Sequence, residues 1–209
     1  MSMESSHEHT EQKLPGSTAS ANANYNPIVQ DNNDGDQLPA IVIPGDDQEE
    51  AIHQSFQDPI TLHDAAKVAF RRYWTNGQVA NLNQAVEYWH KALKLTPPNS
   101  PNRPALQNNL AIALQDRYKH TGNLTDLEAA IDFIQQAVQT TPSDSPNLPA
   151  RLSNLTIGLR DRYMRTGNRI DLEAAISASR QAIQATPVNS PDLPRWQNNL
   201  GMVLSDRYT

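Results

Sequence analysis

A repeat of 45 residues constrains the fold of this chain more than any other feature of its sequence. Its clearest marker is an Arg-Tyr pair that recurs at this interval, as Arg72-Tyr73, Arg117-Tyr118, Arg162-Tyr163 and Arg207-Tyr208. Thr-Pro and Ser-Pro pairs recur in the same register, with prolines at positions 97, 142 and 187 and at positions 101, 146 and 191. Such a period is typical of supersecondary units that stack on one another. The repeat predicts binding along an extended surface, but it does not identify the ligand.

The first 60 residues differ sharply in charge from the rest of the chain. They contain eleven acidic residues and one basic residue, Lys13, which gives a net charge of −10. The remainder has 16 basic and 12 acidic residues, a net charge of +4, so the overall value of −6 combines an acidic arm with a mildly basic body. The arm is rich in Ser, Asn, Asp, Gln and Gly, and it cannot bury enough apolar surface to offset its ordering entropy. We therefore expect residues 1–57 to be a disordered arm and residues 58–209 to form the repeats.

Composition also argues against several classes of protein. The chain has no N-terminal apolar segment of the signal-peptide kind and no run of 18 apolar residues, so neither secretion by a standard signal nor a membrane span is expected. Cysteine is absent, which excludes disulfides, thiolate metal sites and cysteine nucleophiles. These features predict an intracellular, cytoplasmic protein with no membrane partner, although the nucleus is left open.

The unit at residues 100–144 shows how the first helix of each repeat is expected to form. Its apolar residues follow at intervals of four, the spacing of one helix face, as Leu106, Leu110, Leu114 and Tyr118. Ser100 can cap this helix with Pro101 in its first turn, although Pro104 leaves the start open. Gly122 can end it in the left-handed conformation.

The second helix of the same unit shows apolar residues at steps of three and four. We expect it to begin at Asp126, or at Thr125 if that residue and Glu128 form a capping box, and to end before Pro142. The same plan is expected in units at residues 58–99, 145–189 and, as a half repeat, 190–209. The first unit is the most degenerate, as a terminal cap would be.

The second helices resemble those of tetratricopeptide repeats. Each places Ala, a variable residue four positions on, Ala three further and Pro five beyond, as Ala85, Trp89, Ala92, Pro97; Ala130, Ile134, Ala137, Pro142; and Ala175, Ser179, Ala182, Pro187. The first helices have Leu110-Ala111, Leu155-Thr156 and Leu200-Gly201 where the family has Leu and a small residue. The resemblance covers residues 60–209. It implies an all-α, right-handed α-solenoid of antiparallel helix pairs, and a non-catalytic scaffold that binds a protein or peptide.

The repeat length departs from the usual unit of about 34 residues. With its recurrent Arg-Tyr, Thr-Gly, Asp-Leu-Glu-Ala-Ala and Thr-Pro-x-x-Ser-Pro segments, the chain resembles the long arrays that accompany caspase-like CHAT domains. That resemblance implies an alternative function, as the N-terminal regulatory part of a larger CHAT-type protease. The chain ends at Thr209, inside a first helix. We therefore expect a longer protein, a truncated gene product, or end-to-end self-association through an uncapped last helix.

No catalytic or metal site is evident in the sequence. His7 and His9 flank Glu8, but a solvated tail is favoured over a chelate, and His63 and His90 lie on different expected helices. We therefore predict no catalytic residues, no metal and no cofactor. Asp-Arg-Tyr, which recurs from Asp116, Asp161 and Asp206, is expected to be structural. Adjacent helical side chains point about 100° apart, so Asp and Arg should pair with neighbouring repeats, while Tyr buries its ring and satisfies its hydroxyl locally.

Candidate partner-binding residues are those that vary between repeats at one register of the first helices, which line the concave face in this family. They are Asn108, Ile112, Gln115, Ser153, Ile157, Arg160, Asn198, Met202 and Ser205. Three of them, Ile112, Ile157 and Met202, form an apolar row that could receive an extended peptide or an amphipathic helix. Burial of this row against neighbouring repeats is an equal alternative. Nucleic acid is not the expected partner, because the basic excess is small and aromatic residues are few.

The arm contains one short apolar segment, Ile41-Val42-Ile43, followed by Asp46, Asp47, Glu49 and Glu50. It resembles a SUMO-interacting motif, which pairs by strand addition. Docking of the arm onto the basic repeats is a comparable alternative, and a plain linker is favoured over both.

Overall fold

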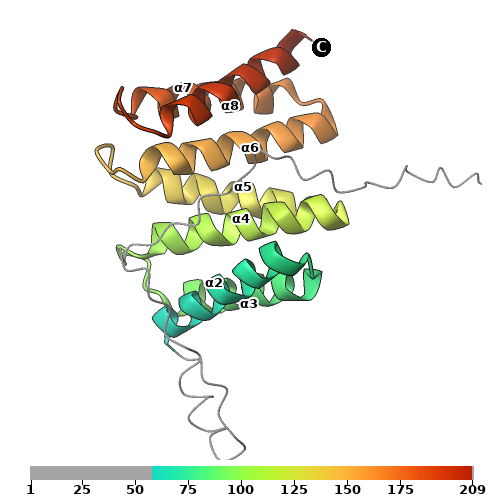
Figure 1. Cartoon of the computed structure of the whole chain (residues 1–209), viewed down its shortest axis with the longest axis vertical. Helices are drawn as coiled ribbons and strands as arrows, with labels where there is room; N and C mark the ends of the chain where they lie inside the picture. Colours follow the sequence, from blue (N-terminus) through green and yellow to red (C-terminus); the bar gives the residue numbers. More distant parts are fainter. Residues whose placement is uncertain (1–57, 209) are drawn as a thin grey trace, which may run out of the picture.

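The computed structural model describes residues 58–208 of this protein, and this part of the chain is helical throughout apart from short connections (Figure 1). The elements are α2 (Pro59–Asn76), α3 (Val79–Leu95), α4 (Arg103–Thr121), α5 (Leu124–Gln139), α6 (Leu148–Thr166), α7 (Arg169–Gln184), α8 (Leu193–Ser205) and η2 (Asp206–Tyr208). The described residues contain no strand. Residues 1–57 and Thr209 lie outside the described part, so the predicted disorder of the arm and its apolar segment remain predictions.

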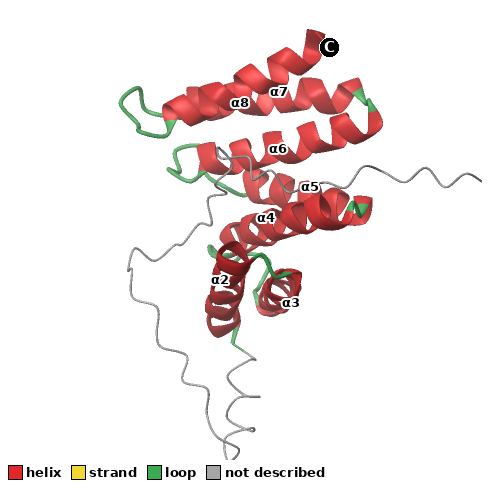
Figure 2. Ribbon diagram, turned by 45° about the vertical axis from the view of Figure 1, so that its right-hand side comes forward, coloured by secondary structure: helices red, strands yellow, loops and turns green. Residues whose placement is uncertain are grey.

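The helices pack in adjacent pairs that follow one another along the molecule (Figure 2). The most extensive contacts join α2 to α3, α4 to α5 and α6 to α7, and each second helix of a pair then packs against the first helix of the next. The first helices of successive pairs also touch, α4 against α6 and α6 against α8. The expected all-α solenoid of helix pairs is confirmed. The unit boundaries predicted from the sequence remain predictions.

Glycine ends the first helix of each complete pair. Gly77, Gly122 and Gly167 have φ of 69°, 69° and 70°, the left-handed region that other residues rarely adopt. Each glycine N–H donates to the carbonyl oxygen of the recurrent tyrosine four residues earlier, at 2.7 Å. The next helix begins two residues later, so the two helices of a pair run antiparallel with their ends close together. The predicted glycine cap is confirmed.

The second helices begin earlier than the sequence analysis expected. Helix α5 starts at Leu124, and its N-cap is Asn123, whose side-chain oxygen accepts a hydrogen bond from the Thr125 N–H at 3.1 Å. Asn168 caps α7 in the same way. The predicted starts at Thr125 or Asp126 are therefore wrong, because an asparagine next to the glycine satisfies the free N–H first.

The first helices, by contrast, begin slightly later than Ser100 would place them. Helix α4 starts at Arg103 with Pro104 in its first turn. Ser100 instead closes the preceding turn, where its carbonyl oxygen accepts from the Arg103 N–H at 3.1 Å. Proline fits the first helical turn because its missing N–H would have no partner there. Pro149 and Pro194 occupy the same position in α6 and α8.

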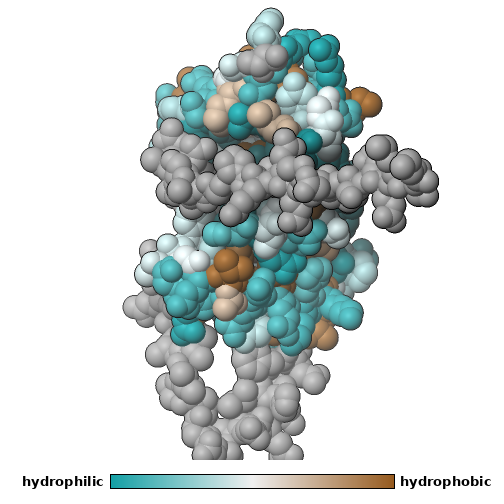
Figure 3. All heavy atoms as spheres, turned by 90° about the vertical axis from the view of Figure 1, so that its right-hand side faces the viewer, coloured by the Kyte–Doolittle hydropathy of each residue, from teal (hydrophilic) through white to brown (hydrophobic). Residues whose placement is uncertain are grey.

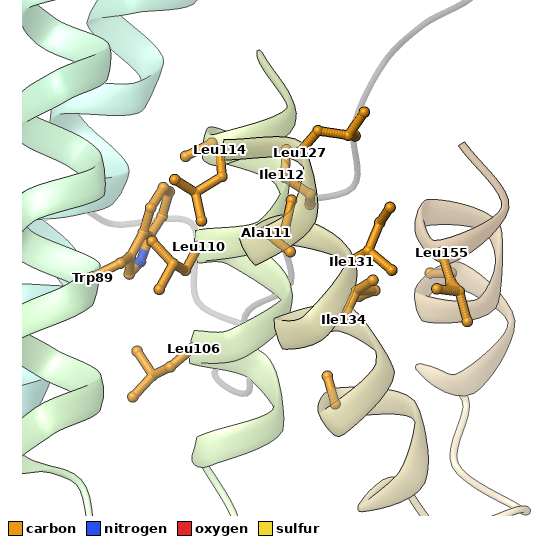
Figure 4. Packing of buried hydrophobic residues seen from close by; sticks show 14 of the residues in the cluster. Trp89, Leu106, Leu110, Ala111, Ile112, Leu114, Leu127, Ile131, Ile134 and Leu155 are labelled. Atoms are coloured by element: carbon orange, nitrogen blue, oxygen red, sulfur yellow. The ribbon is translucent and has the colours of Figure 1, made fainter. Parts of the chain in front are cut away.

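One continuous hydrophobic core runs through the stacked pairs (Figure 4). In the first pair, Trp89 is fully buried, and its Nε1 donates to His63 Nδ1 at 3.0 Å. Leu106 and Leu110 of α4 lie on the side of that helix that faces Trp89, while Ile131 and Ile134 of α5 point towards Leu155 of α6. Because each second helix has apolar residues on both sides, it joins its own pair to the next. The core therefore holds the first helices in register, one above another.

Candidate binding surface

The nine residues predicted from the variable register of the first helices differ widely in exposure. Four are buried, three are partly buried and two are exposed, in the order Asn108, Ile112, Gln115, Ser153; Ile157, Arg160, Met202; and Asn198, Ser205. Helix α4 is the most enclosed, since every residue from Pro104 to Asp116 is buried. Helix α8 buries only Trp196, Asn199 and Val203. Exposure at this register therefore increases from α4 to α8. The assignment of the nine residues as partner contacts remains a prediction.

Two of these positions take part in hydrogen bonds between successive first helices. Asn154 Nδ2 donates to Asn108 Oδ1 at 3.0 Å, which joins α6 to α4. One repeat further on, Asn199 Nδ2 donates to Ser153 Oγ at 2.7 Å, which joins α8 to α6. All four side chains are buried, so each bond satisfies polar groups that would otherwise be costly to remove from water.

The asparagine in each bond belongs to a recurrent position that sequence reasoning missed. Asn109, Asn154 and Asn199 stand 45 residues apart. Apolar spacing and variable positions do not reveal this residue, because it is polar and does not vary between the repeats. The signal that could have found it is recurrence of an amide in the middle of a helix, where a buried side chain needs a hydrogen-bond partner.

Gln115 and Arg160 occupy equivalent positions and make different contacts with the next repeat. Gln115 Nε2 donates to the backbone oxygen of Asn154 at 3.2 Å. Arg160 makes a two-point contact with Asp206, with distances of 2.5 Å from Nε to Oδ2 and 3.2 Å from Nη2 to Oδ1. The carboxylate raises the pKa of the Arg160 guanidinium through this hydrogen bond. Both residues therefore connect repeats, whatever they also do for a partner.

Two of the three arginines of the Asp-Arg-Tyr segments do not pair as expected. Arg117 binds Asp126 of its own repeat at 2.7 Å and 2.6 Å, and Arg162 binds Asp171 in the same way at 2.9 Å and 2.6 Å. The prediction that they pair with neighbouring repeats is therefore wrong for these two arginines. It is right for Arg207, whose Nη2 lies 3.1 Å from Glu173 Oε1 of the preceding repeat. The tight glycine turn brings the end of one helix beside the start of the next, so a carboxylate nine residues on is within reach.

Among the aspartates of these segments, Asp116 is buried, while Asp161 and Asp206 are partly buried. Burial raises the pKa of Asp116 to about 6; Lys119, whose Nζ lies 3.4 Å from Asp116 Oδ1, opposes that rise, and Asp161 adds to it. Burial likewise raises the pKa of Asp161. Neither Oδ2 atom has a hydrogen-bond partner within the described residues. By contrast, Asp206 pairs with Arg160 of the preceding repeat, as the sequence analysis expected of these aspartates.

The tyrosine hydroxyls reach the next repeat instead of bonding locally. The hydroxyl of Tyr73 is 2.6 Å from His120 Nε2, and that of Tyr163 donates to the Asp206 carbonyl oxygen at 3.4 Å. Burial raises the pKa of Tyr73 to about 12, with a smaller contribution from the charge of Asp116. The expectation of a local hydroxyl partner is wrong for these two residues, although their rings are partly buried as predicted.

Metal-ligating side chains do not cluster in the described part of the chain. Residues 58–208 contain no group of three or more metal-ligating side chains. His63 accepts a hydrogen bond from Trp89, and His90 packs against Phe133 with ring centroids 5.6 Å apart, so both histidines have structural contacts. His7 and His9 lie outside the described residues. None of the described helices is long and apolar enough to cross a membrane.

Large apolar side chains at the surface are scattered over several elements. Those exposed among the described residues are Ile60, Trp74, Leu95, Met164, Ile170, Val188 and Tyr208. The face seen in Figure 3 is mainly hydrophilic where it is described, with separate hydrophobic spots. Single exposed apolar residues are common in proteins and do not by themselves mark a binding site.

Comparison with known proteins supports the repeat assignment. A family model described as "Tetratricopeptide repeat" matches residues 105–147, which cover almost all of α4, the whole of α5 and the connection to α6. No curated protein matches the chain. The matched segment coincides with one helix pair, and the other pairs repeat its packing.

Proposed function

We propose that this chain, which is a tetratricopeptide-like repeat protein, is a non-catalytic scaffold whose first helices bind a peptide or helix from a protein partner. Repeats of this type generally mediate protein–protein interaction. The proposal is supported by the stacking of the first helices, since contacts between α4 and α6 and between α6 and α8 line up equivalent positions into rows.

The observation that carries this proposal is the row that crosses α6 and α8. Ile157 and Met202 are equivalent residues of these two helices, and both remain partly exposed. Asn198 and Ser205 are exposed on α8, one turn to either side of Met202. Apolar residues with polar neighbours at this spacing can hold alternate side chains of an extended peptide, or one face of an amphipathic helix. Ile112, the equivalent residue of α4, is buried, so α6 and α8 supply the accessible part of the row.

Peptide selection on the full-length protein tests this proposal. Peptides selected from a random phage-displayed library would be measured against the natural chain and against Asn198→Arg and Met202→Glu. We expect each variant to bind at least about tenfold more weakly. Asn198→Arg adds bulk and charge beside the row, and Met202→Glu places a charge within it. Gln184→Arg is the matched control, since Gln184 is an exposed amide on the second helix α7.

Two outcomes would contradict the proposal. If the peptides bound Asn198→Arg and Met202→Glu as tightly as the natural chain, the binding surface would lie elsewhere. Failure to select any peptide would argue against peptide binding altogether. Asn198 is exposed and on the surface of α8, so Asn198→Arg should keep the melting temperature of the natural chain, which separates lost binding from lost folding.

A further inference from the structure

The first helix pair carries a basic hollow on its second helix. The hollow has a volume of about 410 Å³ and is lined by Glu87, His90, Lys91, Leu93, Lys94 and Arg103. Five of these residues belong to α3, and Arg103 is the first residue of α4. The basic hollow therefore spans the connection between the first and second pairs, away from the row on α6 and α8.

Positive charge exceeds negative charge in the basic hollow. Glu87 is its one carboxylate, and its Oε1 lies 2.7 Å from Lys91 Nζ. Arg103 donates to the backbone oxygens of Leu93 and Thr96 at 3.0 Å and 2.7 Å, so its charge is held in place by neutral acceptors. Lys94 adds a further cation. Burial and the nearby charges of Arg117 and Lys94 lower the pKa of His90, so His90 contributes little charge near neutral pH.

No other repeat of the described chain has this arrangement. Lys91 and Lys94 are replaced by Gln136 and Gln139 in the second pair and by Gln181 and Gln184 in the third. Arg103 is replaced by Leu148 and Leu193 at the corresponding helix starts. The basic hollow is therefore not needed for stacking. The first repeat has basic residues at positions where the other repeats have neutral ones.

The acidic arm joins the repeats at the start of α2, close to the basic hollow. Helix α2 starts at Pro59, and because α2 and α3 are antiparallel, its start lies at the same end of the pair as the end of α3 at Leu95. Glu50, the nearest of the four clustered acids, precedes Asp58 by eight residues. An extended chain of that length spans roughly 26 to 29 Å, whereas a helix is only about 10 Å across. The acids can thus reach the hollow from where the arm joins the repeats.

We propose that Asp46, Asp47, Glu49 and Glu50 dock on the basic hollow formed by Lys91, Lys94 and Arg103. The first 60 residues have a net charge of −10 and the rest of the chain has +4, so the two parts attract each other. Single exposed ion pairs are weak. The tether compensates, because a short flexible linker gives an effective concentration on the order of millimolar. Such a contact is expected to be reversible and sensitive to salt.

A spin label on the arm tests this inference in the full-length protein. The chain has no cysteine, so Gln48→Cys creates a single attachment site for a nitroxide. At low salt we expect strong broadening of the backbone amide signals of Lys91, Lys94 and Arg103. Salt at about 1 M, where the screening length is about 3 Å, should abolish it.

Substituting the residues that the other repeats have at these positions makes the test specific. Lys91→Gln combined with Lys94→Gln gives α3 the residues found in α5 and α7, and should remove the broadening with no loss of folding. Arg180→Gln is the control, because it removes an exposed cation from α7 without touching the hollow. Broadening that survives the double variant would overturn the inference, as would broadening centred on α4, α6 and α8, which would place the arm on the first helices.

Discussion

The α4–α6 interface and the α6–α8 interface use equivalent positions, but they differ in whether an aspartate is paired with an arginine. In the α6–α8 interface, Arg160 holds Asp206 in a two-point ion pair. In the α4–α6 interface, the position of Arg160 is taken by Gln115, and Asp161, the equivalent of Asp206, is partly buried with a raised pKa. One substitution between repeats therefore decides whether this carboxylate forms a two-point ion pair. Repeats that look alike in sequence need not contribute equally to stability.

The two interfaces also differ in how closely their helices approach. A Cβ atom at Gly158 of α6 would lie 2.7 Å from Gln115 Nε2 and 3.1 Å from Ile131 Cγ1. The equivalent residue of α8 is Val203, which is fully buried. The α4–α6 interface thus depends on a missing side chain, whereas the α6–α8 interface is filled by one.

Gly158→Val should have the largest effect. It gives α6 the residue that α8 has at this position, but the branched side chain would overlap Gln115 and Ile131. We expect a loss of about 1 to 3 kcal/mol, the usual cost of overpacking, measured as a lower denaturant midpoint. Gly201→Val is the matched control, because a Cβ at Gly201 meets no atom within 4 Å. Equal midpoints for the two variants would show that the helices do not approach closely at Gly158.

Arg160→Gln should make the α6–α8 interface resemble the α4–α6 interface, which has Gln115 at the equivalent position. Because both side chains are partly exposed, we expect a loss of only about 1 kcal/mol. A double-mutant cycle with Asp206→Asn measures the coupling by denaturant unfolding. Strict additivity of the two single variants would mean that the ion pair contributes nothing.

Asp116→Asn should make stability depend less on pH. The pKa of Asp116 is raised from 3.8 to about 6, so its ionised form is disfavoured in the folded chain. The corresponding stability is fully present below pH 3.8 and is lost as pH rises through about 6. The variant should therefore gain on the order of 1 kcal/mol at pH 7.5 and nothing at about pH 3.5. A variant that is less stable at pH 7.5 would show that the charge is well compensated.

His120→Phe should have the smallest effect, on the interface between the first two pairs. It removes the hydrogen bond to Tyr73 but keeps a ring against the tyrosine, whose centroid is 5.5 Å from that of His120. We expect a loss of about 0.5 to 1 kcal/mol. Tyr73→Phe should cost the same, and the double variant should cost no more than either one. Additive losses in thermal unfolding would contradict a shared hydrogen bond.

Local features were predictable because they depend on a few adjacent residues. The apolar periods, the glycine caps and the prolines after the second helices were all visible in the sequence. The starts of the helices were not, because several residues compete to cap them. Asn123 took the role expected of Thr125 or Asp126, and Asp126 was left to bind Arg117.

The candidate site was less predictable than the fold. Sequence spacing placed Ile112 and Ile157 in one row, but it could not show that α4 buries the first while α6 leaves the second partly exposed. Exposure depends on how many neighbours surround each helix in the stack, and that is a property of position along the solenoid. The relation to CHAT-type proteases and end-to-end association through α8 remain predictions.

The sequence by itself determined the repeat, the helices and their turns, because a period of 45 residues and a glycine at each turn act through contacts between residues close in the chain. Only the tertiary structure decided which charges are paired. The contacts between Arg160 and Asp206 and between Asn154 and Asn108 join residues 46 positions apart. Such contacts form only when helix pairs stack with a particular offset. That offset is decided by side-chain packing, and at Gly158 by the absence of a side chain.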